Sequence, residues 1–92
     1  MDELEFEEEA IPTITEDRVY YKASVSGFPV SVAASNEALA KLWQAQRGPF
    51  DVRLLDAFDP LHVDARAYIE QKYNHVGLDD NNAILLTADD LQ

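Results

Sequence analysis

His62 is the residue of this 92-residue chain best suited to acid–base chemistry, because aspartates lie three residues before it and two residues after it. Residues three apart share a face of a helix, so Asp59 can face His62 whereas Asp64 points elsewhere. A His–Asp pair can serve as a general base. No activated nucleophile accompanies this pair, and the competing interpretation is a surface histidine in a first helical turn whose cap is Asp59. The second interpretation is favoured, so no catalytic residue is predicted.

The sequence offers few residues that could bind a metal ion or a cofactor. The chain has no cysteine, and its two histidines, His62 and His75, lie thirteen residues apart, which is not a metal-binding spacing on a helix. A zinc site would therefore need carboxylates to complete it. The segment "DDNNA" (79–83) lacks the glycine and the closing glutamate of a calcium loop, and the three glycines are isolated. We predict no metal and no cofactor.

Five aromatic residues are interpreted as core residues rather than as a binding stripe, because they recur at helical spacing. They are Trp43, Phe50, Phe58, Tyr68 and Tyr73. Tyr20 lies in the opposite register to Val19 and Tyr21, so it is the aromatic residue expected to be exposed or to lie in an interface.

The surroundings of His62 depend on how "DVRLLDAFDPLHVDARAYIEQKY" (51–73) folds. Both ends of this segment have helical periodicity, but Pro60 in its middle would clash with a preceding carbonyl if one helix ran through it. The pair Asp-Pro is typical of a helix start, with Asp59 as the cap and Pro60 in the first turn. We therefore predict two helices, at about 51–58 and 60–74, with a bend between them.

A β-hairpin and a helix are predicted before this segment. Apolar residues alternate over 18–26 and again over 29–34, and Gly27 between the two runs tolerates a positive φ. Pro29 has no N–H, which suits an edge-side strand. The sequence "SNEALAKLWQAQRGP" (35–49) changes to helical periodicity, and its closing Gly-Pro pair stops the helix.

The two ends of the chain complete the predicted fold. Residues 1–17 are expected to be an acidic, partly ordered segment in which 4–6 can add a short strand. The run "AILLT" (83–87) is apolar on both faces, which favours an interior strand, and "TADD" (87–90) is typical of a last helical turn. We thus predict α+β architecture, in which 18–92 form one domain. Its small antiparallel sheet, made of the N-terminal hairpin and the C-terminal strand, packs against two to three helices.

The net charge of −11 is concentrated at the two ends of the chain. Residues 1–17 hold eight acidic and no basic residues, 18–75 hold six acidic and seven basic, and 76–92 hold four acidic and none basic. Nucleic acids and anionic membranes are disfavoured as partners, because phosphate contacts need clustered Lys and Arg. The N-terminus does not resemble a signal peptide and the apolar runs are too short to span a bilayer, so we expect a cytoplasmic protein.

Three stretches, "DRVYYKASVSGFPVSVAASNEALAKLW", "LLDAFDPLHVDARAYIEQKY" and "ILLTADDL", resemble a family of short bacterial proteins, the domain-of-unknown-function 1488 family. The similar elements are a strand of the form R-V-x-[FY], a strand that leads into a capped "EAL" helix, an "AFD" before a helix with "A…Y", and a terminal L-T-x-x-D. They cover residues 17–91, and the Asp-Pro joint and the acidic head depart from the pattern. The resemblance implies a small α+β domain and implies no activity.

The favoured function is a small non-catalytic interaction or accessory module, because the sequence has core-forming elements and no assembled site. Its partner would be another protein, or a second copy in a homodimer formed through an edge strand. The first alternative is an acidic decoy or inhibitor of a basic, nucleic-acid-binding protein, which the near-neutral middle of the chain weakens. The second alternative is an enzyme that uses His62.

Overall fold

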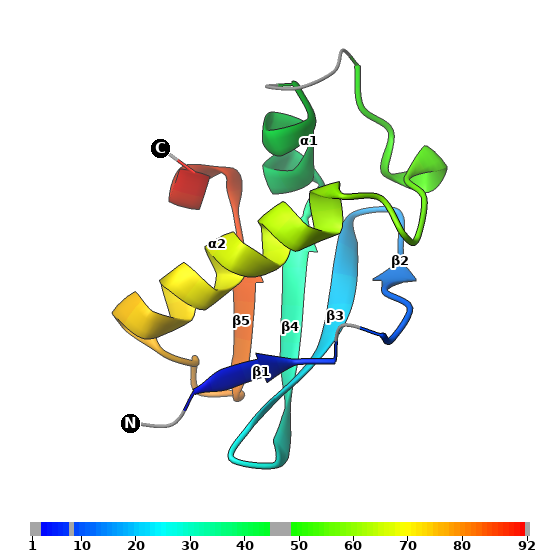
Figure 1. Cartoon of the computed structure of the whole chain (residues 1–92). Coiled ribbons are helices and arrows are strands. Elements are labelled where there is room, and N and C mark those ends of the chain that lie inside the picture. Colours follow the sequence, from blue (N-terminus) through cyan, green and yellow to red (C-terminus); the bar gives the residue numbers. More distant parts are fainter. Residues whose placement is uncertain (1–2, 8, 45–48, 92) are drawn as a thin grey trace.

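The computed structural model describes residues 3–7, 9–44 and 49–91, and within them one five-stranded sheet lies beside two α-helices (Figure 1). The predicted α+β class is confirmed. The elements in chain order are β1 (Leu4–Phe6), β2 (Thr13–Ile14), β3 (Arg18–Val25), β4 (Phe28–Ser35), α1 (Asn36–Gln44), the 3-10 turn η1 (Val52–Leu54), α2 (Leu61–Val76), β5 (Ala83–Leu86) and the 3-10 turn η2 (Ala88–Leu91).

The predicted hairpin is confirmed as β3 and β4, which pair antiparallel over their whole length. Ser26 and Gly27 connect them with φ angles of 51° and 83°, the positive values that a two-residue hairpin turn of this kind requires. The edge position suggested by Pro29 is wrong, because β4 lies between β3 and β5. Pro29 is tolerated there because β5 pairs with β4 only from Ser31 onward.

The last strand corrects two predictions about the sheet. β5 lies at an edge rather than in the interior, and it runs parallel to β4, so the sheet is mixed and not antiparallel throughout. The parallel direction follows from the long connection through both helices, which returns the chain to the same end of the sheet. Leu85 is only half-buried although it is apolar, because it faces away from Ile84 and Leu86, which reach the core.

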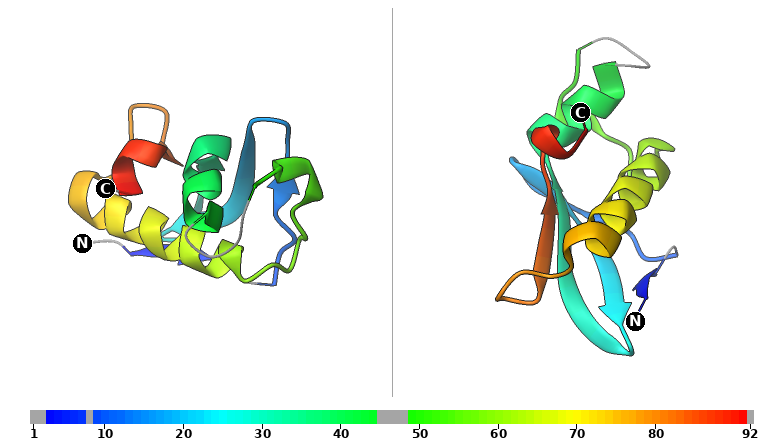
Figure 2. Two further views of the ribbon diagram at one scale, coloured as in Figure 1. Left: turned by 90° about the horizontal axis from the view of Figure 1, so that it is seen from above. Right: turned by 90° about the vertical axis from the view of Figure 1, so that its left-hand side faces the viewer.

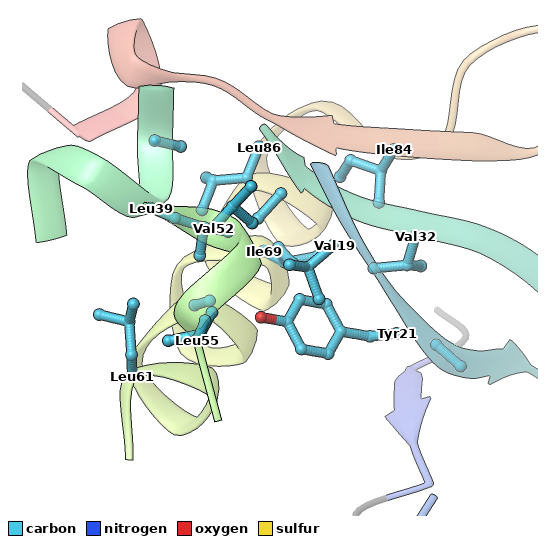
Figure 3. Close-up of a cluster of buried hydrophobic side chains, with 14 of the residues drawn as sticks. Val19, Tyr21, Val32, Leu39, Val52, Leu55, Leu61, Ile69, Ile84 and Leu86 are labelled. Atoms are coloured by element: carbon cyan, nitrogen blue, oxygen red, sulfur yellow. The ribbon is translucent and has the colours of Figure 1, made fainter. Parts of the chain in front are cut away.

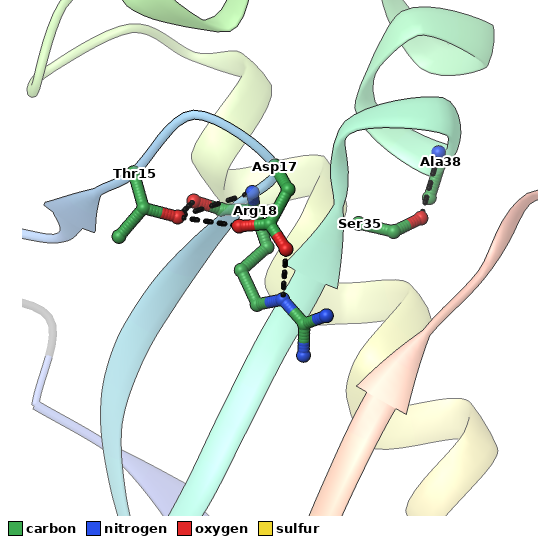
Figure 4. Close-up of polar contacts among 5 residues, drawn as sticks. All are labelled: Thr15, Asp17, Arg18, Ser35 and Ala38. Carbon is green, nitrogen blue, oxygen red and sulfur yellow. Dashed lines mark hydrogen bonds and ion pairs between the residues drawn. The ribbon is translucent and has the colours of Figure 1, made fainter.

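The N-terminal segment extends the other side of the sheet. β1 and β2 both pair antiparallel with β3, β1 along its C-terminal half and β2 near its start. The short strand that the sequence allowed at 4–6 is therefore present. Just before β3, the hydroxyl of Thr15 contacts both Asp17 and the backbone of Arg18, and this tight turn leads the chain from β2 into β3 (Figure 4).

Helix α1 begins where β4 ends. The Oγ atom of Ser35 accepts a hydrogen bond from the N–H of Ala38 at 3.1 Å, which satisfies one of the free amides of the first turn (Figure 4). α1 is described as far as Gln44, and the predicted stop at Gly48 lies outside the described residues.

Pro60 is a helix boundary, as predicted, but only one of the two predicted helices exists. α2 begins at Leu61, whose N–H bonds to Oδ1 of Asp59 at 2.9 Å. The helix predicted over 51–58 is wrong, because the chain makes the single turn η1 and is then extended at Leu55. The carboxylate of Asp56 accepts the N–H of Phe58 at 2.8 Å, and such a local bond competes with helix formation.

The core lies between one face of the sheet and α2, which crosses that face (Figure 2). It is closed from above by α1 and η1, and the labelled side chains of all these elements converge in Figure 3. Leu4 is also buried in this cluster, so β1 contributes to the core. The buried members are Leu4, Val19, Tyr21, Ala23, Val32, Ala34, Ala38, Leu39, Val52, Leu55, Leu61, Ala65, Ile69, Ile84 and Leu86.

Candidate functional site

His62 is the second residue of α2 and only 2% of its surface is exposed, so the prediction of a surface histidine is wrong. The physical reason is that His62 lies on the face of α2 that packs against the sheet. His62, Ala65 and Ile69 are spaced by three and four residues, so they share the helix face that lies on the sheet, and all three are buried.

Both ring nitrogens of His62 are hydrogen-bonded to protein groups. Nδ1 lies 2.7 Å from the hydroxyl of Tyr21 on β3, and Nε2 lies 2.9 Å from the backbone carbonyl oxygen of Asp56. A carbonyl can only accept a hydrogen bond, so these contacts assign the proton to Nε2 and leave Nδ1 to accept from the Tyr21 hydroxyl. This is the neutral form of the imidazole.

Burial sets the electrostatics of this pair. It lowers the pKa of His62 below the ordinary value of 6.5, although the carbonyl of Asp56 opposes the shift. Burial also raises the pKa of Tyr21, so the phenol stays protonated. The two rings meet edge to face, with centroids 5.5 Å apart and planes inclined by 71°, and the Tyr21 hydroxyl points from β3 toward α2 (Figure 3).

The arrangement around His62 is suited to holding elements together rather than to proton transfer. A general base needs a nitrogen that can reach a substrate proton, whereas each nitrogen of His62 already has a protein partner among the described residues. Through these two bonds the imidazole connects the start of α2 to β3 and to the loop that follows η1.

The other residues that the sequence placed near this chemistry have separate roles. Asp59 caps α2, as predicted. Asp64 does not contribute to the two hydrogen bonds of the His62 ring. His75 is exposed near the opposite end of α2, so the two histidines are not neighbours. The described part of the chain contains no group of three or more His, Asp or Glu side chains placed to hold a metal ion.

A hollow of about 190 Å³ adjoins His62 near the start of α2. His62, Asp59 and Arg66 contribute to its lining. The remaining wall residues are apolar and come from the β1–β2 connection, from the loop before Pro60 and from α2. These wall residues are Ala10, Pro12, Ala57, Phe58 and Val63.

Two large apolar side chains in the wall of this hollow are strongly exposed, and a third exposed one lies between two wall residues in the sequence. The exposed fractions are 64% for Ile11, 80% for Phe58 and 59% for Val63. We call Pro12, Phe58 and Val63 together the Phe58 surface. Single exposed apolar residues are ordinary, whereas neighbouring ones in the wall of one hollow favour a binding site.

The predicted aromatic core is thus partly wrong. Phe58 is exposed because the segment it belongs to is not helical, so the helical spacing argument does not apply to it. Tyr68 is 38% exposed on α2. The remaining three, Trp43, Phe50 and Tyr73, are partly buried against the core, and Tyr20 is exposed as expected.

Sequence reasoning missed Tyr21 and Arg66 as neighbours of His62. Tyr21 has an inward register in β3, which was visible in the alternation, but no sequence signal connects it to a residue forty-one positions later. Arg66 follows His62 by one helical turn, so its neighbourhood was readable once α2 was placed.

Comparisons with known proteins found no match to this chain. No protein-family model matches it, no curated protein matches it and no solved structure matches it. The resemblance to the domain-of-unknown-function 1488 family stays a prediction. Within the described residues, no helix has the length and apolar character needed to cross a bilayer.

Proposed function

We propose that this protein is a non-catalytic interaction module that binds another protein through the Phe58 surface. The observation that carries the proposal is the strong exposure of Phe58 and Val63 in the wall of one hollow. Burying a side chain of this size at an interface contributes about 1.5–3 kcal/mol, so a protein partner gains from covering both.

The edge of β5 that faces away from β4 favours binding through the Phe58 surface over addition of a partner strand, because its backbone groups already have internal partners. The N–H and the carbonyl of Ala83 both bond to Asp79, at 3.0 and 2.9 Å. The carbonyl of Leu85 accepts from Nζ of Lys72 at 2.6 Å, and Lys72 is paired with Asp90. A strand added at this edge would have to displace these internal partners.

The opposite edge gives little more to a homodimer. β1 has three residues, and the exposed Glu5 and Glu7 lie along it and beside it. Two copies that met there would bring like charges together at an edge that is already short. Both edges therefore favour a partner that covers side chains rather than one that extends the sheet.

The acidic-decoy alternative has less support. Glu3, Glu5 and Glu7 are exposed, and the burial of Leu4 holds this stretch against the core. A mimic of nucleic acid needs carboxylates spread over the folded surface, whereas the middle of the chain carries nearly balanced charge.

Site-specific cross-linking in cells of the source organism tests the proposal. A benzophenone amino acid replaces Phe58 in one variant and Phe28 in the control, since Phe28 is 74% exposed on the hairpin. We expect a cross-linked partner protein from position 58 and none from position 28. The partner, identified by mass spectrometry, should then bind the purified protein and lose that binding when Val63→Asp places a charge on the Phe58 surface.

Three outcomes would contradict the proposal. Equal cross-linking from both positions would show that exposure alone captures protein. Adducts that contain only two copies of this chain would replace the partner with a homodimer. A partner that binds the Val63→Asp variant with unchanged affinity would show that it does not bind through the Phe58 surface.

A further inference from the structure

Arg66 is an unusual cation in this structure because it is half-buried and has no polar partner among the residues that the structure describes. It makes no hydrogen bond or ion pair with any residue in 3–7, 9–44 or 49–91. Its contact with the Tyr21 ring is loose, with the guanidinium carbon 6.0 Å from the ring centroid. By contrast, Arg18, Arg53 and Lys72 are paired with Asp17, Asp51 and Asp90.

The position of Arg66 indicates where a binding partner could supply the missing polar contact. Its side chain contributes to the lining of the hollow beside the Phe58 surface, together with Asp59, His62 and five apolar residues. Partial removal from water penalises a charge that has no partner, so a group that pairs with Arg66 would gain from doing so. A guanidinium presents a planar fork of N–H donors that matches a carboxylate.

We propose that the hollow receives a carboxylate that stands next to an apolar side chain in a segment of the partner protein. The carboxylate pairs with Arg66, and the apolar side chain packs on Phe58 and Val63. This inference rests on the proposed function, since it names the chemistry of the partner at the same surface.

Asp59 fixes the orientation of that segment. It also lines the hollow, and its Oδ1 atom already accepts the N–H of Leu61. Asp59 and Arg66 are seven residues apart, about two turns along the start of α2. A carboxylate is repelled near Asp59 and attracted near Arg66, so it has one favourable place in the hollow.

The charge of the whole molecule argues for a basic partner, and the local arrangement argues against one. With a net charge of −11, a basic segment would be attracted from a distance. Inside the hollow, however, its cation would meet the unpaired guanidinium. Short-range pairing decides the complex, because salt screens exposed charges beyond about 8–10 Å at physiological ionic strength.

The test is an NMR titration with two small probes of equal shape. N-acetyl-leucine carries the carboxylate beside an apolar side chain, and N-acetyl-leucinamide replaces the carboxylate with a neutral amide. Both are added at neutral pH to the full chain, and the signals of Arg66 Nε–H, Tyr21 and Val63 are followed. A probe of this size binds with a dissociation constant on the order of millimolar, which such a titration measures.

We expect N-acetyl-leucine to shift these signals at saturating concentration and N-acetyl-leucinamide to bind about tenfold more weakly, because the charged pair is lost. Arg66→Gln should weaken N-acetyl-leucine to the level of the amide. Arg66→Lys, which keeps the charge but not the fork, should fall between the two. The matched control Arg53→Gln, which removes a cation already paired with Asp51, should leave binding unchanged.

Equal shifts from both probes, or unchanged binding of N-acetyl-leucine to the Arg66→Gln variant, would overturn the proposal that a carboxylate pairs with Arg66. Tighter binding of N-acetyl-lysinamide than of N-acetyl-leucine would overturn it in favour of a basic segment. Cross-linking from position 58 separates this failure from failure of the proposed function. If the cross-linked partner persists while the carboxylate probe fails, the module stands and only the chemistry assigned to Arg66 is wrong.

Discussion

At the scale of single residues, His62 shows how a polar side chain is accommodated in a small core. The imidazole is buried, yet each nitrogen has a partner of the correct kind, a donor at Nδ1 and an acceptor at Nε2. Burial of an unpaired polar group would cost about 1–3 kcal/mol, which is a large part of the stability of a domain of this size. The pairing with Tyr21 therefore allows a histidine where the helix pattern calls for an apolar residue.

Stability should decline in weak acid because of His62. Its folded pKa lies below 6.5, so the unfolded chain takes up the proton first as the pH falls below about 6.5. This contribution is complete above that pH and is lost progressively below it. Urea unfolding between about pH 7 and pH 5, above the range where most carboxylates titrate, should show a falling midpoint.

Two variants isolate the histidine responsible for this decline. His62→Gln cannot take up a proton, so the midpoint should change less over the same pH range. His75→Gln removes the exposed histidine and should leave the decline as it is in the original chain. A decline that persists in His62→Gln and disappears in His75→Gln would reverse the assignment.

At the scale of elements, the joint at Pro60 explains which sequence signals were sufficient. Asp59 and Pro60 fix a helix start through local geometry alone, and the start is where the sequence placed it. Alternation over β3 and β4 likewise fixes a hairpin. The segment before the joint was misassigned because its periodicity is short and three aspartates offer competing turns, among them Asp56, which bonds to Phe58.

The cap of α2 should account for a measurable share of stability. Asp59→Ala removes the acceptor for the N–H of Leu61, so the free energy of unfolding should fall by about 1 kcal/mol. Asp59→Asn keeps a side-chain oxygen at the same place and should recover most of that loss. The two variants are compared by urea unfolding. A loss of equal size in both would assign the effect to the charge of Asp59 instead of the cap.

At the scale of the whole molecule, the order of the strands was beyond the reach of the sequence. Alternation indicates which residues of β5 face inward. Apolar residues on both faces of a strand, however, do not distinguish an edge strand from an interior one. The position of β5 depends on where two helices return the chain. In the same way, the hollow beside Arg66 is formed where residues 10–12 meet residues 57–66, and no sequence signal connects these two distant stretches.

The acidic N-terminal stretch should stabilise the whole molecule through one residue. Leu4 is 6% exposed within the core cluster, whereas Glu5 beside it is exposed. Leu4→Ala should lower the free energy of unfolding by about 2–3 kcal/mol, toward the lower end for buried leucines because β1 lies at an edge and can adjust. Glu5→Ala should change it by less than about 0.5 kcal/mol. Equal, small effects would mean that β1 is not anchored in solution.

The parallel pairing of β4 with β5 has a consequence for the order in which the chain assembles. The β3–β4 hairpin closes through two residues and can form early, within microseconds. β5 is separated from β4 by the residues of α1, η1 and α2, and the entropy of closing so long a loop opposes its docking until the helices are in place. We therefore expect β5 to join last, so that weakening it speeds unfolding and leaves the rate of folding nearly unchanged.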